Sequence, residues 1–244
     1  MMKESNRASK ITLWLSLGVL GAAIIAALVI FFLPAENSTD TPDVAATAGP
    51  APALSTPTAD AAGIGCEAPP SDDRQVPEDL RWEAENGVTW PVSDTVGPTK
   101  TEDGFAACFE HSPIGAALAA TAITFSTTEQ TQLDTLKFYL ADSPGRDVAL
   151  ANTAPGTYSS IKEQIQANGL ALVGFKIEEY DGDRASVRLV LRVPDSPTGF
   201  RGVPSPMVWV DGDWMLKPLD DGMTGQPSDE GPSNFTNWTA AGIG

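Results

Sequence analysis

The chain contains one histidine, His111, and a catalytic role for it is the first chemistry to consider. A catalytic histidine needs a positioned nucleophile and a third group that orients it. Ser112 is adjacent, but it precedes Pro113 in the pattern of a helix N-cap, and the sequence contains no G-x-S-x-G elbow. We therefore expect His111 to be a structural residue at the start of a helix.

Carboxylates with suggestive spacing flank two glycines. Paired carboxylates can act as general acid and base when they share a site, but an Asp-Gly dipeptide also predicts a tight hairpin turn. Turn chemistry explains these aspartates without further assumptions, and Glu178–Glu179 is expected to be a solvated strand end. The aspartates concerned are Asp181, Asp183, Asp211 and Asp213.

The sequence has no pattern for metal or cofactor chemistry. No segment has the spacing of a calcium loop, a phosphate loop or a dinucleotide fingerprint. Two cysteines without a histidine cluster make a poor zinc site. We expect no catalytic residue, no metal ligand and no cofactor, and we do not expect an enzyme.

An uncharged apolar run at residues 11–33 determines where the chain works. At about 1.5 Å per residue it gives roughly 35 Å of helix, which is enough to cross a bilayer. Lys3, Arg7 and Lys10 precede it, and the next basic residue is Arg74, so the N-terminus is expected in the cytoplasm. A cleaved signal peptide is the alternative, but its apolar core is usually shorter. We expect a retained single-pass anchor in the cell membrane and an extracytoplasmic C-terminal domain.

The segment after the anchor is rich in proline, alanine and threonine and has no aromatic or basic residue. Such a composition buries too little apolar surface to offset chain entropy. The net charge of −17 argues against nucleic acid and anionic lipid as partners of the exposed part. The expected organisation is a cytoplasmic stub at 1–10, a transmembrane helix at 11–33, a disordered linker at 34–65, an extracytoplasmic domain at 66–219 and an acidic Gly- and Pro-rich tail at 220–244, where Phe235 and Trp238 are candidates to dock.

The two cysteines, Cys66 and Cys108, both fall on the expected outer side of the membrane. That compartment permits disulfides, and two thiols make one bridge. The alternative is two unrelated buried thiols. We predict a Cys66–Cys108 disulfide that fastens the irregular segment 66–109 to the core.

Helical periodicity occupies the middle of the chain. The first expected helix begins after Ser112, with small residues that permit close packing on a sheet. A second begins near Thr131, a short helical piece follows Ser143-Pro144, and a third helix begins near residue 157 and ends at Asn168-Gly169. The expected apolar stripes are Ile114, Leu118, Ala122 and Phe125 in the first helix, Leu133, Leu136 and Leu140 in the second, and Tyr158, Ile161 and Ile165 in the third.

From residue 171 the apolar period changes to two, which indicates β-strands. We predict four antiparallel strands near 171–178, 185–193, 207–210 and 214–217, with a long hairpin loop at 194–205. A first short strand is expected at 104–109. The fold class predicted is therefore α+β, with helices packed on a four-stranded antiparallel sheet.

The order of three helices and then a meander resembles the cone-shaped, cystatin-like fold of nuclear transport factor and its relatives. The resemblance covers about residues 104–219 and implies a curved sheet that wraps a long helix. Folds of this kind often enclose a pocket, so a small-ligand role stays open.

A narrower resemblance lies in residues 80–120. The runs Trp90-Pro91-Val92-Ser93, Gly97-Pro98 and Ser112-Pro113-Ile114-Gly115-Ala116-Ala117 are similar to motifs of an uncharacterised family of actinobacterial proteins. In that family a membrane helix and a linker precede one extracellular domain. Its members resemble, in plan, the bitopic inner-membrane subunits of type IV secretion and conjugation machines.

The resemblance implies a non-enzymatic subunit of a cell-envelope assembly, with other proteins of a transfer or secretion complex as partners. Two alternatives are an accessory protein of an actinobacterial lipid-import system and a ligand-binding or hydrolytic cone domain. A homo-oligomer stays open.

The predicted disulfide leads to a stability test. Closing a loop of about 43 residues restricts the unfolded chain by roughly 4 kcal/mol on the chain-entropy model. We expect Cys108→Ser to lower the melting temperature clearly and to increase hydrogen exchange in 66–109 before the helices and sheet. Quantitative alkylation of both thiols in the unreduced, unfolded protein would contradict the bridge.

Overall fold

A computed structural model describes residue 66 and residues 69–85, 87–126, 131–153 and 167–239. The expected anchor, the linker and most of the helix expected near 157 lie outside these residues. Within them, no helix combines the length and apolar character that a membrane crossing needs.

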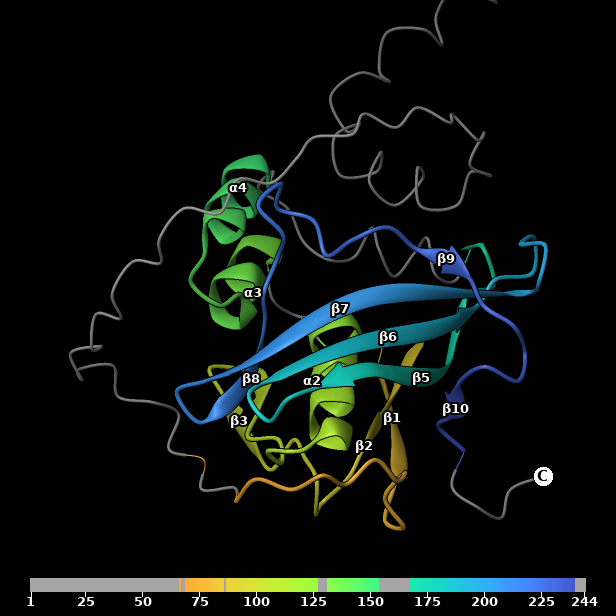
Figure 1. The fold of residues 1–244 in the computed structure, drawn as a ribbon, viewed down its shortest axis with the longest axis horizontal. Coiled ribbons are helices and arrows are strands. Elements are labelled where there is room, and N and C mark those ends of the chain that lie inside the picture. Colours follow the sequence, from red (N-terminus) through yellow and green to blue (C-terminus); the bar gives the residue numbers. More distant parts are fainter. Residues whose placement is uncertain (1–65, 67–68, 86, 127–130, 154–166, 240–244) are drawn as a thin grey trace, which may run out of the picture. The chain divides into compact units, whose positions relative to one another are not determined.

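The described elements form an α+β arrangement, in agreement with the predicted class (Figure 1). All strand pairings are antiparallel. The elements are β1 (Arg81–Glu85), β2 (Val88–Val92), β3 (Lys100–Glu102), β4 (Phe105–Ala107), α2 (Pro113–Phe125), α3 (Gln132–Tyr139), α4 (Pro144–Asn152), β5 (Ala171–Tyr180), β6 (Arg184–Arg192), β7 (Phe200–Val210), β8 (Asp213–Leu216), β9 (Ser228–Asp229) and β10 (Thr236–Asn237).

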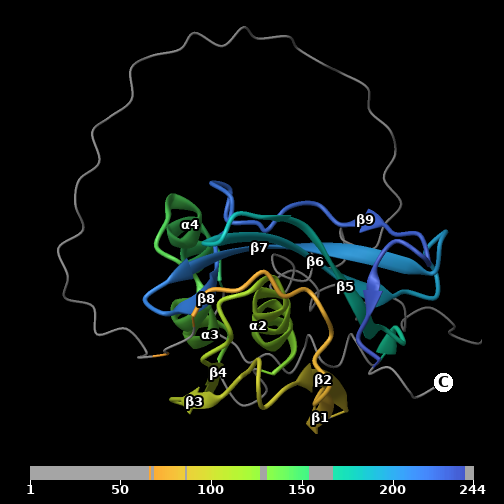
Figure 2. The ribbon, with the colours of Figure 1, turned by 60° about the horizontal axis from the view of Figure 1, so that its bottom comes forward.

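Helix α2 lies at the centre of the core. The main sheet packs on one side of it, and the β1–β2 and β3–β4 hairpins pack on the other (Figure 2). Its N-cap is Ser112, as predicted, with the hydroxyl oxygen accepting the Gly115 N–H at 3.0 Å. The helix is buried on nearly all sides. The buried Thr121 hydroxyl has a hydrogen-bond partner within the helix, because it donates to Ala117 O at 2.8 Å. The small residues of α2 therefore allow close packing against both the main sheet and the two hairpins.

The main sheet has six strands where the sequence predicts four. Its order is β10-β5-β6-β7-β8, and β9 pairs with β7 beside β8. Strands β5 and β6 occur where predicted. Gly169, expected to end the third helix, has the left-handed φ of 61°. The extra strands come from the segment expected to be a tail.

Strand β7 begins at Phe200, so the prediction of a loop at 194–205 is wrong. The pattern was misread because Pro204 and Pro206 lack a backbone N–H, which usually excludes them from a paired strand. Lys217 N–H donates to Pro206 O at 2.8 Å, so the backbone polar groups of Pro206 face away from β6. No donor to β6 is lost, and the prolines are accommodated.

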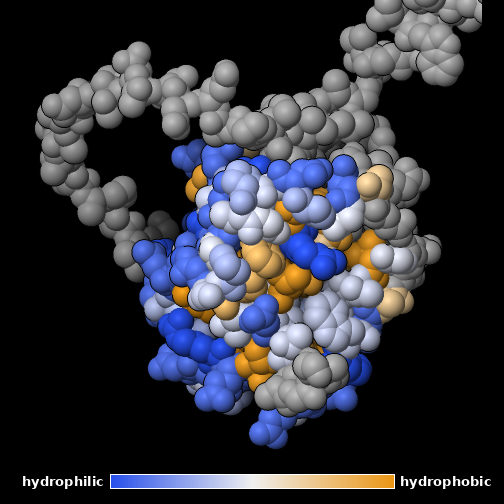
Figure 3. Space-filling view, turned by 90° about the vertical axis from the view of Figure 1, so that its right-hand side faces the viewer, coloured by the Kyte–Doolittle hydropathy of each residue, from blue (hydrophilic) through white to orange (hydrophobic). Residues whose placement is uncertain are grey.

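The segment after residue 219 belongs to the sheet. Strand β9 pairs with β7, and β10 pairs with β5. Trp238 is 0% exposed and its ring lies 4.2 Å from that of Phe175, centroid to centroid. The ordered domain therefore continues past the boundary expected at 219. On the side that carries β9 and β10, hydrophilic residues separate apolar surface patches (Figure 3).

Helices α3 and α4 begin at the expected caps, Thr131 and Ser143. The predicted leucine stripe of α3 is found only in part. Leu140, at the C-cap, is buried, but Leu133 and Leu136 are only half-buried, and Thr135 and Tyr139 are the buried residues within the helix. The Tyr139 hydroxyl donates to Ala106 O at 2.9 Å, which joins α3 to β4. The hydrogen bond and the aromatic ring of Tyr139, and not the leucine spacing alone, therefore determine which face of α3 is buried.

The structure joins Cys66 to Cys108, with their Cα atoms 5.3 Å apart. Asp213, 3% exposed, fixes the second cysteine from the other side. Its carboxylate accepts N–H groups from Cys108 at 2.7 Å, from Phe109 at 3.1 Å and from Trp214 at 2.9 Å. Cys108 has a φ of 63°, which is costly for a residue with a side chain. The carboxylate therefore stabilises an unfavourable backbone conformation next to the disulfide.

Replacing this carboxylate should destabilise the domain strongly. Asp213→Ala leaves three N–H groups without their acceptor, all of them in buried residues, at about 1–3 kcal/mol for each buried group. We expect a loss of at least about 3 kcal/mol in the free energy of unfolding, measured by chemical denaturation. Asp195→Ala, at an exposed turn, is the matched control and should change little. Similar losses in both variants would contradict the role of Asp213.

The same carboxyl group should make stability depend on pH. Burial raises the pKa of Asp213 above its ordinary 3.8, and the three N–H donors oppose this only in part. A raised folded-state pKa gives stability that is complete below 3.8 and is lost as the pH rises through the raised pKa. The stability difference between wild type and Asp213→Asn should therefore shift against wild type as the pH rises above 3.8. A difference that is constant with pH would refute this.

Candidate interaction groove

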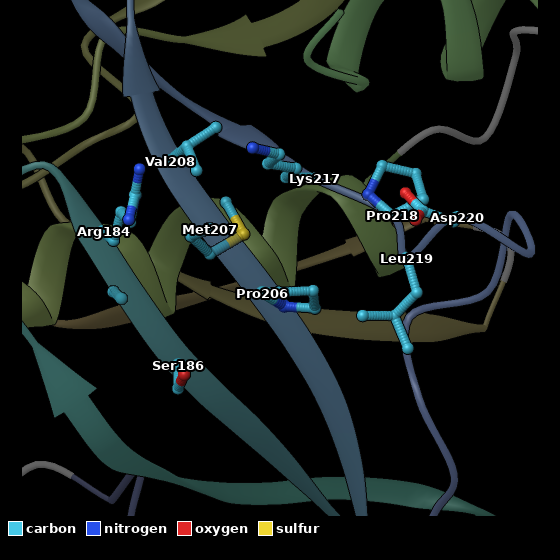
Figure 4. Close-up of a pocket in the computed structure, with 10 residues that line it drawn as sticks. Arg184, Ser186, Pro206, Met207, Val208, Lys217, Pro218, Leu219 and Asp220 are labelled. Carbon is cyan, nitrogen blue, oxygen red and sulfur yellow. The ribbon is translucent and has the colours of Figure 1, made fainter. Parts of the chain in front are cut away.

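Two hollows on the main sheet join into one groove along β7. The larger has a volume of about 580 Å³ and the smaller about 300 Å³. Both are open to solvent. Arg184, Val208 and Lys217 line both of them, and Figure 4 shows Val208 between the two basic side chains. We call this surface the β7 groove.

Strand alternation places the floor of the β7 groove on the face away from α2. Ala185 and Val187 are buried and Met207 pairs with Leu216 in the core row. Their neighbours along the strands lie on the opposite face. These neighbours are Arg184 and Ser186 on β6, and Pro206 and Val208 on β7.

The segment after β8 forms one wall of the groove. Leu219 in this wall is 51% exposed, which is unusual for a large apolar side chain in this domain. Its backbone is held in place because Leu219 N–H donates to Met223 O at 2.8 Å. Helix α4 supports it from behind, since a Cβ on Gly145 would lie only 2.0 Å from Leu219 O. The wall is therefore fixed although its side chain faces solvent.

An aromatic cluster supports the other end of the groove. Trp209 lines the smaller hollow and stacks on His111, with centroids 3.9 Å apart and an angle of 4°. Trp214 meets both rings edge-on, at 5.7 Å from His111 and 5.4 Å from Trp209. His111 Nε2 lies 2.9 Å from Gly182 O, and because a carbonyl only accepts, Nε2 carries the proton. The cluster ties the β5–β6 turn to β7.

The cations of the groove lack acidic partners among the described residues. Arg184 and Lys217 form no ion pair there, although the sequence has 32 acidic and only 15 basic residues. Asp142 pairs with Arg146 at 2.8 Å, and Asp183 lies 3.4 Å from His111 Nε2. Asp220 alone of the lining acids has no such partner among these residues. Two cations and three carboxylates therefore line the groove together, and it carries no excess of positive charge.

The predicted structural roles of His111 and Ser112 agree with the geometry. His111 is buried against two tryptophans, and the Ser112 hydroxyl is used by the helix cap. Among the described residues, the imidazole of His111 contacts Gly182 O, Asp183 and the rings of two tryptophans, and none of these is a serine, threonine or cysteine. These two residues do not form a catalytic pair.

The aspartate pairs separate into turn residues and one buried anchor. Asp181 Oδ1 accepts Arg184 N–H at 2.9 Å, and Asp211 and Gly212 both have positive φ, as a tight hairpin turn requires. For Asp213 the prediction of turn chemistry was incomplete, because its side chain reaches β4's end and the disulfide. Its role requires contacts across 105 residues of sequence, which spacing alone cannot reveal.

The pair Glu178–Glu179 was predicted as a solvated strand end. Both are exposed, but the Glu178 carboxylate receives two 3.1 Å hydrogen bonds from Arg188. The bond from Arg188 is the main cause that lowers the pKa of Glu178. This ion pair lies on the sheet face beyond the groove.

Of the residues that line the β7 groove, sequence reasoning singled out Asp183, and it did so as a turn residue. The sequence signal for the groove was a pair of basic residues at strand ends. Arg184 begins one strand, and Lys217 directly follows a later one. Recognising it required the correct extent of β7, which the two prolines concealed.

The described residues contain no group of His, Cys, Asp and Glu side chains arranged to hold a metal. The groove combines apolar side chains with two cations and three carboxylates. The domain is thus an α+β module with an open groove on its main sheet.

Comparison with known proteins places the chain in a family. Residues 43–240 match the family described as a domain of unknown function, DUF8175, and the chain belongs to it. No curated protein and no solved structure matches the chain.

Proposed function

We propose that this protein is a non-enzymatic, membrane-anchored subunit of a cell-envelope assembly that acts through protein contacts of its extracytoplasmic domain. The expected apolar anchor at 11–33 and the disulfide-forming cysteines support an outer location for the domain. A sheet packed over helix α2 is compatible with the cone-type fold that the sequence resembles.

The observation that carries the proposal is the β7 groove. It is open, and apolar side chains, two cations and three carboxylates line it. Small-molecule sites are usually concave enough to bury most of the ligand. An open groove of this kind favours a protein segment over a small ligand.

The setting proposed first is conjugative transfer or a type IV secretion-like machine, on the strength of the motifs in residues 80–120. The second is an actinobacterial lipid-import system, because the plan of helix, linker and domain serves both. A small-ligand-binding cone domain is the third candidate, and the larger hollow of about 580 Å³ is where such a ligand would bind.

Site-specific crosslinking in membranes tests the proposal. A photoreactive phenylalanine analogue is placed at Val208, in the groove. The control carries the same analogue at Arg192 of β6, which lies on the same face of the sheet but outside the groove. We expect identified transfer or secretion subunits to crosslink at 208 and not at 192. Crosslinks only to lipid-import permeases would reject the first setting, and equal crosslinking at both positions would reject the groove as the contact.

The orientation of the chain has its own test. Ser5→Cys and Ser55→Cys variants are treated in intact cells with a membrane-impermeant thiol reagent. Position 55 should be labelled and position 5 should not, because the basic stub is expected to stay in the cytoplasm. Labelling of position 5 alone would reverse the topology and remove the extracytoplasmic role.

A further inference from the structure

We propose that the outer edge of β1 pairs with β1 of a second copy, so that the protein forms a weak symmetric dimer by strand addition. The proposal goes beyond the proposed function and depends neither on the β7 groove nor on the envelope setting. It follows from three features of β1, namely an open backbone edge, an exposed tryptophan on that edge and an order of charges that selects one register.

The outer edge of β1 is open among the described residues. The β1–β2 hairpin lies on the side of α2 away from the main sheet, and β1 pairs there with β2 alone (Figure 2). Pro91, opposite Trp82, has no N–H, so these two residues form a pair without mutual hydrogen bonds. The N–H and C=O groups of Trp82, and of Ala84 two residues further on, therefore point away from β2. They are placed to accept an added strand.

Trp82 supplies apolar surface at this edge. Its side chain is 43% exposed, which makes it one of the few exposed large apolar residues in the described part of the chain. Cross-strand neighbours share a face, so Trp82 lies with Pro91 on the outer face of the hairpin, while Val88, Trp90 and Val92 are buried on the other. Exposed tryptophans are frequent anchors of protein interfaces. A second copy aligned on Trp82 would cover both indole rings.

The charges of β1 select the register of such a pair. In a symmetric antiparallel pair the two-fold axis passes through one residue, which then faces its own copy. An axis at Arg81 or at Glu83 opposes two like charges, and an axis at Ala84 opposes Glu83 to Glu85. Like charges directly opposite each other are destabilising. An axis at Trp82 instead places Arg81 opposite Glu83 of the second copy, and does so twice.

The ion pairs that Arg81 already makes leave room for this contact. Its Nη1 lies 2.7 Å from Asp94 and its Nη2 lies 3.5 Å from Glu83 of the same chain. A guanidinium has five N–H donors, so Asp94 does not use them all. The side chains of Arg81 and Glu83 are both 48% exposed, and exposed ion pairs exchange partners at little cost. Arg81 can therefore keep Asp94 and meet Glu83 of the second copy.

The backbone bonds of this register are few. Each Trp82 exchanges N–H and C=O with its copy, and each Ala84 N–H reaches Leu80 C=O of the second copy, which gives about four hydrogen bonds. The ladder ends there, because Leu80 N–H already donates to Pro77 O at 3.2 Å. A small interface and the net charge of −17 both keep the dimer weak. Confinement of both copies to one membrane raises their effective concentration.

Cysteine crosslinking in membranes tests the register on the full chain. The two native cysteines are joined to each other, so Trp82→Cys introduces the one free thiol. In the proposed register the two Cα atoms at position 82 are about 5.5 Å apart, within reach of a disulfide. We expect mild oxidation to give a covalent dimer.

Ala84→Cys is the matched control for the crosslink. Position 84 faces position 80 of the second copy, so the two introduced cysteines lie roughly 14 Å apart along the strands and should not react. Crosslinking at neither position, at both equally, or at 84 alone would overturn the proposal.

Charge reversal tests the ion pairs independently of the crosslink. Dimerisation of the full chain is measured by sedimentation equilibrium in density-matched detergent. Arg81→Glu and Glu83→Arg each place like charges opposite each other and should weaken the wild-type dimer about tenfold. An equimolar mixture of these two variants should restore dimerisation, because each glutamate then meets an arginine. The double variant Arg81→Glu/Glu83→Arg should restore it as well.

Lys137→Glu is the matched control, because it makes the same change in charge as Arg81→Glu at an exposed position of α3. It should dimerise like wild type. Equal weakening in this control would mean that net charge governs association and would overturn the proposal. So would a wild-type monomer at every concentration, a dimer that both single variants leave unchanged, or a mixture that stays monomeric. None of these results bears on the crosslinks expected at Val208, so failure here and failure of the proposed function are distinguishable.

Discussion

The buried carboxylate of Asp213 is the contact on which the rest of the domain depends. It connects the first residue of β8 to the chain just before α2, and the disulfide lies at the same point. A buried carboxylate is costly unless hydrogen bonds compensate it, and here three N–H groups offset part of that cost. Trp214, the next residue, donates its indole N–H to Glu110 O at 2.9 Å, so neighbouring residues fasten the same junction.

The sheet closes its edges and leaves a face open. Ala141 N–H donates to Leu216 O at 3.0 Å, which covers part of the edge of β8. At the opposite edge β10 covers part of β5, and β5 has two irregularities in its pairing with β6. Closed and irregular edges discourage uncontrolled strand addition. The face of the sheet that carries the β7 groove stays open to solvent.

The sequence predicted those features that depend on neighbouring residues. The cap at Ser112, the turns at Asp181 and Asp211, and the period of β5 and β6 are all local patterns, and the structure contains them. Features that depend on distant contacts escaped. Three features were missed: the role of Asp213, the pairing of β9 and β10, and the strand through Pro204. To predict them, one must know which strand edge or layer of the fold lies next to each segment. The groove escaped for the same reason, because its residues come from three separate segments.

The disulfide also determines how the domain would carry mechanical load. If tension reaches residue 66 from the direction of the membrane, the Cys66–Cys108 bond passes it directly to the chain before α2. The 42-residue loop between the two cysteines, with both small hairpins, is bypassed and bears no force. The contact between Cys108 and Asp213 then bears the load, because it transfers the force to β8 and the main sheet. A domain cross-linked in this way can be pulled at residue 66 while its two small hairpins stay folded.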